Sequence, residues 1–186
     1  MCKVAILIPT INRKEFVIRQ LRYYASVSST HPVYIGDGSA VSAANEIQAA
    51  LDSCGSKLQV YYHHLPGLND RQTIVRLGEL ANETYCAFKG DDDYLIPGSL
   101  SKCADFLHHN PSYRTAQGKA ILFQLNEPGP YGTLKGSHYF FLQLQRPVFA
   151  QKTLNTAGNR ILIRSRPGKE IAIFEIVARL LRFGCD

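Results

Sequence analysis

Apolar and polar residues follow one another along this chain in two alternating patterns. Short, nearly continuous apolar runs such as Lys3–Pro9 and Pro32–Ile35 predict strands that are largely buried. Longer stretches in which apolar residues recur every three or four positions, such as Arg13–Val27, predict amphipathic helices. From residue 3 to residue 123 the patterns alternate as strand and helix, the order of an α/β fold with a mostly parallel central sheet and helices on both faces.

The other predicted elements continue this order. Strands are expected at 58–63, 85–89 and 120–123, and helices at 41–51, 70–81 and 98–110. Asn12 is expected to cap the first helix, and Asn69 or Asp70 the third. An apolar and basic stretch, Ile171–Phe183, predicts one more helix near the end of the chain.

The first predicted helix has an apolar face and a basic face. Val17, Leu21 and Tyr24 fall at helical spacing and are expected to be buried. The basic residues of this helix are expected to lie largely on the face in contact with water: Arg13, Lys14, Arg19 and Arg22. In the second helix, Val41 begins an apolar stripe of the same period.

Composition fits a single soluble globular domain. The chain has 186 residues, of which 45% are hydrophobic and 19% charged. Its five cysteines are scattered without a C-x-x-C pair, which argues against a disulfide framework and against a zinc site. The first apolar run is too short for a signal peptide, and no run is long enough to span a bilayer. The cytoplasm is the expected location.

Charge is distributed unevenly between the two parts of the chain. Residues 1–112 hold 10 Lys and Arg against 11 Asp and Glu, and residues 113–186 hold 11 against 4, so the net charges are −1 and +7. The basic part is interpreted first as ordinary solvated surface. The alternatives are attraction of a diphosphate, of an anionic acceptor, or of the inner membrane surface as a peripheral contact. No motif interleaves basic and aromatic residues, so no nucleic acid partner is expected.

Acidic turns follow two of the predicted strands. Asp91, Asp92 and Asp93 come directly after the strand at 85–89, and Asp37 follows the strand at 32–35. Because ligands of open α/β sheets bind outside the carboxyl ends of the strands, these turns are expected to meet along one edge. Carboxylate oxygens suit Mg²⁺ or Mn²⁺, which keep other positions for water and phosphates. The pattern predicts a metal-diphosphate site, and the alternative is a solvated loop without a ligand.

Familiar nucleotide-binding signatures are missing from this frame. The turn after the first strand, Pro9–Arg13, contains no glycine. It therefore forms neither the dinucleotide G-x-G-x-x-G turn nor a G-x-x-x-x-G-K-[ST] phosphate loop.

At these positions the chain resembles the GT-A-type glycosyltransferases (family-2-like), which use nucleoside-diphosphate sugars. The resemblance lies in Val4-Ala5-Ile6-Leu7-Ile8-Pro9-Thr10 with Asn12-Arg13, in Asp37-Gly38-Ser39, and in Phe88-Lys89-Gly90-Asp91-Asp92-Asp93-Tyr94 with Pro97 and Leu100. It implies a Rossmann-like GT-A fold with a donor-binding domain at 1–130. Residues 131–186 would be a partial acceptor side or a divergent basic segment, so the fold is expected to be truncated or altered at its C-terminus.

The resemblance also implies roles for particular residues. Pro9, Thr10 and Arg13 would lie beside the nucleotide, and Asp37 would accept hydrogen bonds from its base or ribose. Arg71 would reach a phosphate or the base. The alternatives are a surface arginine for Arg13 and Arg71, and a turn-forming aspartate for Asp37.

The implied cofactor is Mn²⁺ or Mg²⁺ on the diphosphate, next to Asp91, Asp92 and Asp93. The family's pattern separates two aspartates by a spacer, and this chain offers two matches. Either Asp91 and Asp93 form the pair, or Gly90 replaces the first aspartate and Asp92 and Asp93 bind the metal. Asp91 is also expected to contact the donor.

The implied activity is transfer of a sugar from a nucleoside diphosphate to a carbohydrate, lipid-linked or protein acceptor. The later residues that could act as a general base each have an ordinary alternative, and none is preferred: Glu127, His138, Glu170 and Glu175. Two other functions stay open, a non-catalytic nucleotide-sugar-binding remnant of the family and an α/β interaction module.

Overall fold

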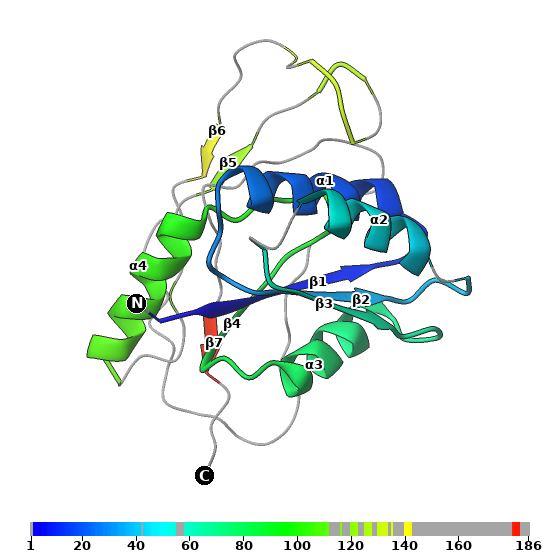
Figure 1. The fold of residues 1–186 in the computed structure, drawn as a ribbon. Coiled ribbons are helices and arrows are strands. Elements are labelled where there is room, and N and C mark those ends of the chain that lie inside the picture. The colour runs from blue at the N-terminus through cyan, green and yellow to red at the C-terminus, as the bar shows by residue number, and fades with distance from the viewer. Residues whose placement is uncertain are drawn as a thin grey trace.

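The computed structural model describes residues 2–41, 43–54, 58–111, 116, 120–122, 125–127, 130–133, 135, 140–142 and 180–182. Strands and helices alternate through most of this part, in the predicted order (Figure 1). The elements are β1 (Val4–Thr10), α1 (Lys14–Ser26), β2 (Val33–Asp37), α2 (Ala44–Cys54), β3 (Val60–His64), α3 (Asp70–Leu80), β4 (Tyr85–Phe88), α4 (Pro97–His109), β5 (Ala120–Leu122), β6 (Phe140–Leu142) and β7 (Leu180–Arg182).

The central sheet has the strand order β3-β2-β1-β4-β7. The four strands from β1 to β4 are mutually parallel, and β7 pairs with β4 in the antiparallel direction. β5 and β6 form a separate antiparallel pair. The predicted α/β class with a mostly parallel sheet is therefore confirmed.

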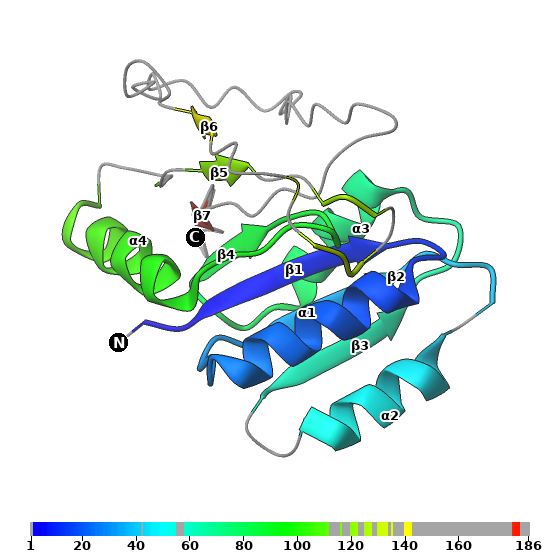
Figure 2. The same ribbon diagram turned by 90° about the horizontal axis from the view of Figure 1, so that it is seen from above.

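Helices cover both faces of the sheet, as the sequence predicts (Figures 1 and 2). On β1, Val4, Ile6 and Ile8 point to the larger core cluster, to which α1, α2 and α4 contribute. Ala5 and Leu7 point to the opposite side, where they pack with apolar residues of α3. Because β1 is buried on both faces, its sequence is a continuous apolar run instead of an alternating one.

The start of α1 differs from the prediction. Asn12 is not the N-cap, because it has a φ of 54° in the turn before the helix, and Arg13 takes the N-cap position without a side-chain cap. Asparagine tolerates this left-handed backbone better than most residues do. Arg19 was expected on the wet face but is only 6% exposed. Val41 does not belong to α2, and its side chain is 83% exposed.

Other predicted helix features agree with the structure. Val17, Leu21 and Tyr24 are fully buried on α1. Asn69 caps α3 through a capping box with Gln72, so two backbone N–H groups of the first turn are satisfied by side chains. None of the described helices has the length and apolar character needed to cross a bilayer.

The predicted helix at Ile171–Phe183 is wrong where the structure describes it. Leu180–Arg182 forms β7, which extends the sheet beyond β4. The unpaired edge of β4 offers backbone hydrogen bonds to such a short apolar run, and hydrophobic spacing alone does not distinguish the two outcomes. Most of the segment 131–186 lies outside the described residues.

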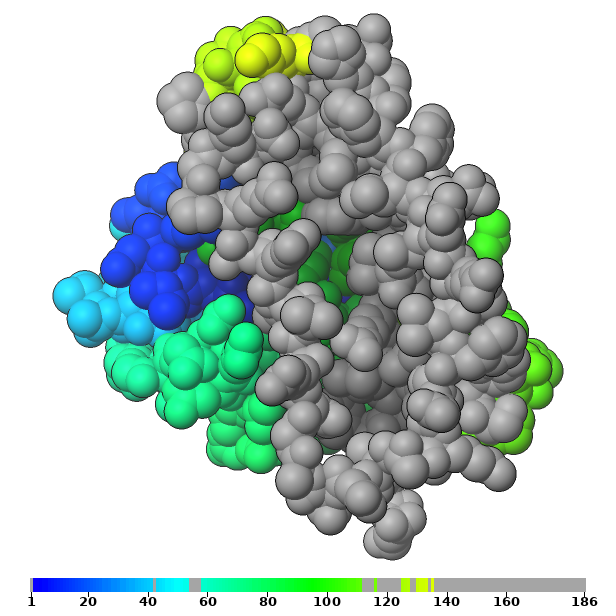
Figure 3. All heavy atoms as spheres, turned by 180° about the vertical axis from the view of Figure 1, so that it is seen from behind, coloured from blue at the N-terminus to red at the C-terminus, as the bar shows by residue number. Residues whose placement is uncertain are grey.

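The loops that follow the parallel strands gather at one end of the sheet. In the view from behind, the chain segments that follow β1, β2 and β3 lie on one side of the molecule, and α4 lies on the other side (Figure 3). The loop end of the sheet is the edge where the acidic turns were expected.

Candidate functional site

The two acidic turns do meet at the carboxyl edge of the sheet, with Thr10 between them. Thr10 ends β1 and is the register partner of Asp37 at the end of β2. On its other side, the Thr10 hydroxyl donates a hydrogen bond of 2.7 Å to Oδ2 of Asp91. Neighbouring strands are about 5 Å apart, so the two aspartates flank Thr10 at about one strand spacing each.

This position is also the topological switch point of the sheet. The chain moves outward from β1 to β2 and β3, and α3 then returns it to β4 on the other side of β1. The loops after β1 and β4 therefore leave the sheet in opposite directions, which opens a binding position between them.

Arg13 bridges the acidic turn from the β1 side. Its guanidinium lies 2.8 Å from Oδ1 of Asp91 and 3.2 Å from Oδ2 of Asp92. The Arg13 side chain is 40% exposed, the Asp91 side chain 5% and the Asp92 side chain 37%. The same guanidinium lies over the ring of Phe16, 4.0 Å from its centroid. The sequence did not predict these ion pairs, and the expected position of Arg13 beside a nucleotide stays a prediction.

Two residues of α1 hold the backbone of the acidic turn. Arg19 donates to the carbonyl oxygen of Asp92 at 3.0 Å, and Gln20 donates to that of Asp91 at 3.1 Å. Both side chains were missed at the sequence level. Gln20 carried a usable signal, because it lies three positions after Val17 and so beside the buried stripe of the helix.

Lys89 completes the support of the turn, and it too was not predicted. Its ammonium donates to the carbonyl oxygens of Gly90 at 3.0 Å and Asp93 at 2.8 Å. Burial lowers the pKa of Lys89, although the neighbouring carboxylates oppose this shift. Burial raises the pKa values of Asp91 and Asp93. Together with the two arginines, Lys89 gives the turn three basic side chains against its three carboxylates.

The Asp37 carboxylate accepts hydrogen bonds from groups of the protein itself. Its Oδ1 accepts from the Ser39 N–H at 2.9 Å and from the Ser39 hydroxyl, and its Oδ2 accepts from the Tyr62 hydroxyl at 2.7 Å. The Ala43 N–H lies at 3.5 Å from Oδ2. Burial opposes ionisation, but these hydrogen bonds prevail and lower the pKa of Asp37. The carboxylate therefore organises the loop after β2.

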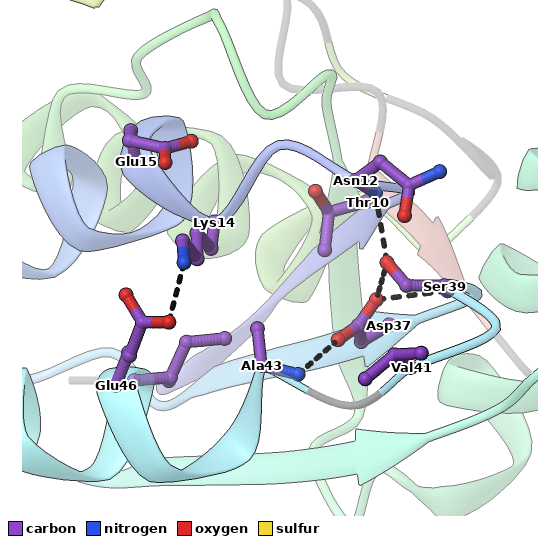
Figure 4. Close-up of a pocket in the computed structure, with 10 residues that line it drawn as sticks. Thr10, Asn12, Lys14, Glu15, Asp37, Ser39, Val41, Ala43 and Glu46 are labelled. Carbon is purple, nitrogen blue, oxygen red and sulfur yellow. Dashed lines mark hydrogen bonds and ion pairs between the residues drawn. The ribbon is translucent and has the colours of Figure 1, made fainter.

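A cavity of about 320 Å³ lies beside Asp37, between the first turns of α1 and α2 (Figure 4). Thr10, Asn12 and Ser39 line it, and an ion pair between Lys14 and Glu46 joins the two helices across it. The Asn12 N–H donates to the Ser39 hydroxyl oxygen at 2.7 Å, which fixes the turn after β1 against the turn after β2. The volume falls in the range of small-ligand pockets and would accept a base or a sugar ring.

The remaining predicted residues are placed as follows. Pro9 pairs with Gly36 in the sheet, one residue before Thr10. Arg71 is exposed on the first turn of α3, which packs on the other face of the sheet, and it does not line the cavity. Glu127 accepts a hydrogen bond of 2.7 Å from the Thr133 N–H in its own loop. Three general-base candidates lie outside the described residues: His138, Glu170 and Glu175.

The acidic turn offers two carboxylates to a cation, not a complete ligand set. Within the described part of the chain, no three His, Cys, Asp or Glu side chains converge as metal ligands. A Cβ added at Gly90 would lie 2.7 Å from Oδ1 of Asp92 and 3.4 Å from Oδ2 of Asp93. The missing side chain thus leaves a small space lined by two carboxylate oxygens. This donor set fits Mg²⁺ or Mn²⁺, which bind through one or two carboxylates and take the rest from water and phosphates.

Neither a protein-family model nor a curated protein matches this sequence. Among solved structures, it is similar to residues 1–349 of S. aureus TarS, with a TM-score of 0.46 and 15% identity over 62% of this chain and 34% of that one. The same part of TarS in complex with UDP-GlcNAc has a TM-score of 0.45 and 18% identity, over 62% of this chain and 33% of that one.

A CMP:2-keto-3-deoxy-manno-octonic acid synthetase in complex with CTP has a TM-score of 0.45 and 12% identity, over 66% of this chain and 58% of that one. The chain thus spans about a third of the TarS chain and less than two thirds of the synthetase chain. The geometry of the site, and not this likeness, supports the assignment proposed below.

Proposed function

We propose that this chain binds a nucleoside-diphosphate sugar at the β1/β4 edge and belongs to the metal-dependent GT-A-type glycosyltransferases. The observation that carries the proposal is the convergence of two sequence-distant segments, and of a cavity, on Thr10. Asp37 is its strand partner, Asp91 accepts its hydroxyl hydrogen bond, and the cavity opens beside it. A cavity next to an acidic turn whose carboxylates are paired with basic side chains suits a nucleoside joined to a diphosphate.

Different residues of the site would bind the nucleoside and the cation. The cavity beside Asp37 would take the nucleoside, with Asn12 and Ser39 as polar partners. Asp92 and Asp93 would hold Mn²⁺ or Mg²⁺ at the space above Gly90. When bound, the cation neutralises charge that develops on the leaving diphosphate.

For the acceptor, the net charge of the later part of the chain supports a proposal about its chemical class only. Residues 113–186 carry a net charge of +7 and lie mostly outside the described residues. Such a segment would attract an anionic acceptor or an anionic membrane surface. Transfer to an acceptor hydroxyl would also need a general base, and the described carboxylate of Glu127 is engaged in its own loop.

Isothermal titration calorimetry with UDP, GDP, ADP and CDP, in EDTA and in Mn²⁺, tests the proposal. Wild type is expected to bind at least one diphosphate more tightly in Mn²⁺. Asp92→Asn should lose this metal-dependent gain, and Asp105→Asn, a matched change on the exposed face of α4, should retain it. A wild type that binds none of the nucleotides would contradict the proposal.

Turnover separates an enzyme from a binding remnant. An enzyme is expected to release the nucleoside diphosphate from the matching nucleotide sugar. A coupled spectrophotometric assay measures this release. Binding without release, with and without candidate acceptors, would instead support the non-catalytic alternative.

A further inference from the structure

We propose that Arg13 is an internal counter-ion of the acidic turn that a divalent cation displaces from Asp92 while Asp91 keeps hold of it. The inference rests on the proposed function and concerns how this chain couples cation binding to diphosphate binding. It follows from the unequal surroundings of the two carboxylates that share one guanidinium.

The contact to Asp91 is the fixed one. The Asp91 side chain is 5% exposed, its Oδ2 accepts from the Thr10 hydroxyl, and its Oδ1 lies 2.8 Å from the Arg13 guanidinium. Removing a cation from a buried carboxylate leaves the charge unpaired and carries a large cost. Arg13 is therefore expected to stay on Asp91 whatever binds nearby.

The contact to Asp92 is the exchangeable one. The pair is longer, at 3.2 Å, and both side chains are more than a third exposed. Exposed ion pairs of this kind contribute about 0.2–1 kcal/mol. The other oxygen of Asp92 borders the space above Gly90, together with an oxygen of Asp93. A divalent cation in that space would draw the Asp92 carboxylate towards itself and compete with Arg13.

Cation binding would then change the ion-pair partners of Arg13. Once Asp92 and Asp93 hold a divalent cation, the guanidinium is paired with one carboxylate instead of two. Half of its donor fork becomes free to bind a second anion. Arg13 lies at the β1/β4 switch point, where the diphosphate of a donor is proposed to lie, so the released donors face that group. Cation and diphosphate binding should therefore be positively coupled, and Arg13 should account for part of the coupling.

The test measures Mn²⁺ and nucleotide binding separately in wild type, Arg13→Gln and Arg76→Gln. Arg76 is a matched control, because its guanidinium forms an exposed ion pair with Glu79 on α3, away from the site. Free Mn²⁺ measured by electron paramagnetic resonance should show binding about two- to fivefold tighter in Arg13→Gln without nucleotide, the fold-change equivalent to the loss of an exposed ion pair. In saturating Mn²⁺, calorimetry should show weaker diphosphate binding by the same variant.

Tighter Mn²⁺ binding together with weaker diphosphate binding by Arg13→Gln would identify Arg13 as the counter-ion. Arg76→Gln should match wild type in both, and circular dichroism establishes that each variant is folded. Equal or weaker Mn²⁺ binding by Arg13→Gln, or no Mn²⁺ binding by any of the proteins, overturns the inference. Failure of the proposed function looks different, because wild type would then bind no diphosphate in Mn²⁺.

Discussion

At the scale of single residues, Thr10 joins the two halves of the proposed site. Replacing it by Val removes the hydroxyl that donates to Asp91 at 2.7 Å and keeps the side-chain shape. A hydrogen bond to a buried carboxylate contributes about 1.5–3 kcal/mol, so Thr10→Val should lower the free energy of unfolding by about that amount. Urea denaturation measures the change. Thr10→Ser keeps the hydroxyl, so its free energy of unfolding should fall much less. An equal decrease in both variants would mean that the hydrogen bond contributes little.

The sequence indicated where the acidic turns lie on the sheet but not the contacts that their side chains make. Asp37 and the three aspartates were identified because acidic residues after apolar runs stand out in one dimension. Arg19 and Lys89 were missed because their burial depends on Phe16 and Tyr94, whose rings flank Arg19, and on carbonyl groups of the turn. Such partners come together only in three dimensions.

At the scale of elements, the close approach of β2 and α3 depends on Gly36. A Cβ at this position would lie 2.3 Å from Cγ2 of Thr73, so Gly36→Ala must push the helix or distort the strand. Overpacking of this kind costs about 1–3 kcal/mol, which exceeds the gain from a stiffer unfolded chain. Gly98→Ala is the control, because nothing lies within 4 Å of its added methyl group. Comparable thermal unfolding of the two variants would contradict the packing account.

His31 connects β1 to α4 and makes this link dependent on pH. Its Nδ1 accepts from the Val4 N–H at 3.1 Å, and its Nε2 lies 3.1 Å from the carbonyl oxygen of Pro97, so the ring is neutral with its proton on Nε2. Burial lowers the pKa of His31 below the value of 6.5 expected in the unfolded chain.

Stability from neutral His31 is thus fully present above pH 6.5 and is lost as the pH falls through the lower, folded pKa. His31→Gln cannot titrate, so its deficit in free energy of unfolding should be largest near about pH 8 and should shrink towards about pH 5. Urea titrations of both proteins across this range measure the difference. A deficit that stays constant would mean that His31 titrates alike in the folded and unfolded states.

Strands and helices were predictable to the extent that their own residues determine them. β1 is buried on both faces, and its apolar run identified it without any other information. The two candidate caps, Asn69 and Asp70, likewise marked the start of α3, and the structure uses Asn69. The turn at Asn12 was misjudged because its backbone is fixed by Ser39, a residue of the next strand's loop. β7 was misjudged because its conformation is set by pairing with β4.

At the scale of the whole molecule, the strand order produces the site. The order β3-β2-β1-β4 puts the loops after β1 and β4 side by side at the switch point, and the parallel direction places the end of β2 next to them. The acidic turn lies there with three basic side chains around it. The central claim is that a nucleoside diphosphate and a divalent cation bind at this edge.

Anomalous diffraction at the manganese edge, from crystals containing Mn²⁺ and the diphosphate that binds best in calorimetry, tests this claim most directly. One strong peak is expected within coordination distance of the Asp92 and Asp93 carboxylates, with the diphosphate beside Arg13 and the nucleoside in the cavity next to Asp37. A peak elsewhere on the molecule, or a nucleotide bound away from the β1/β4 edge, would contradict it.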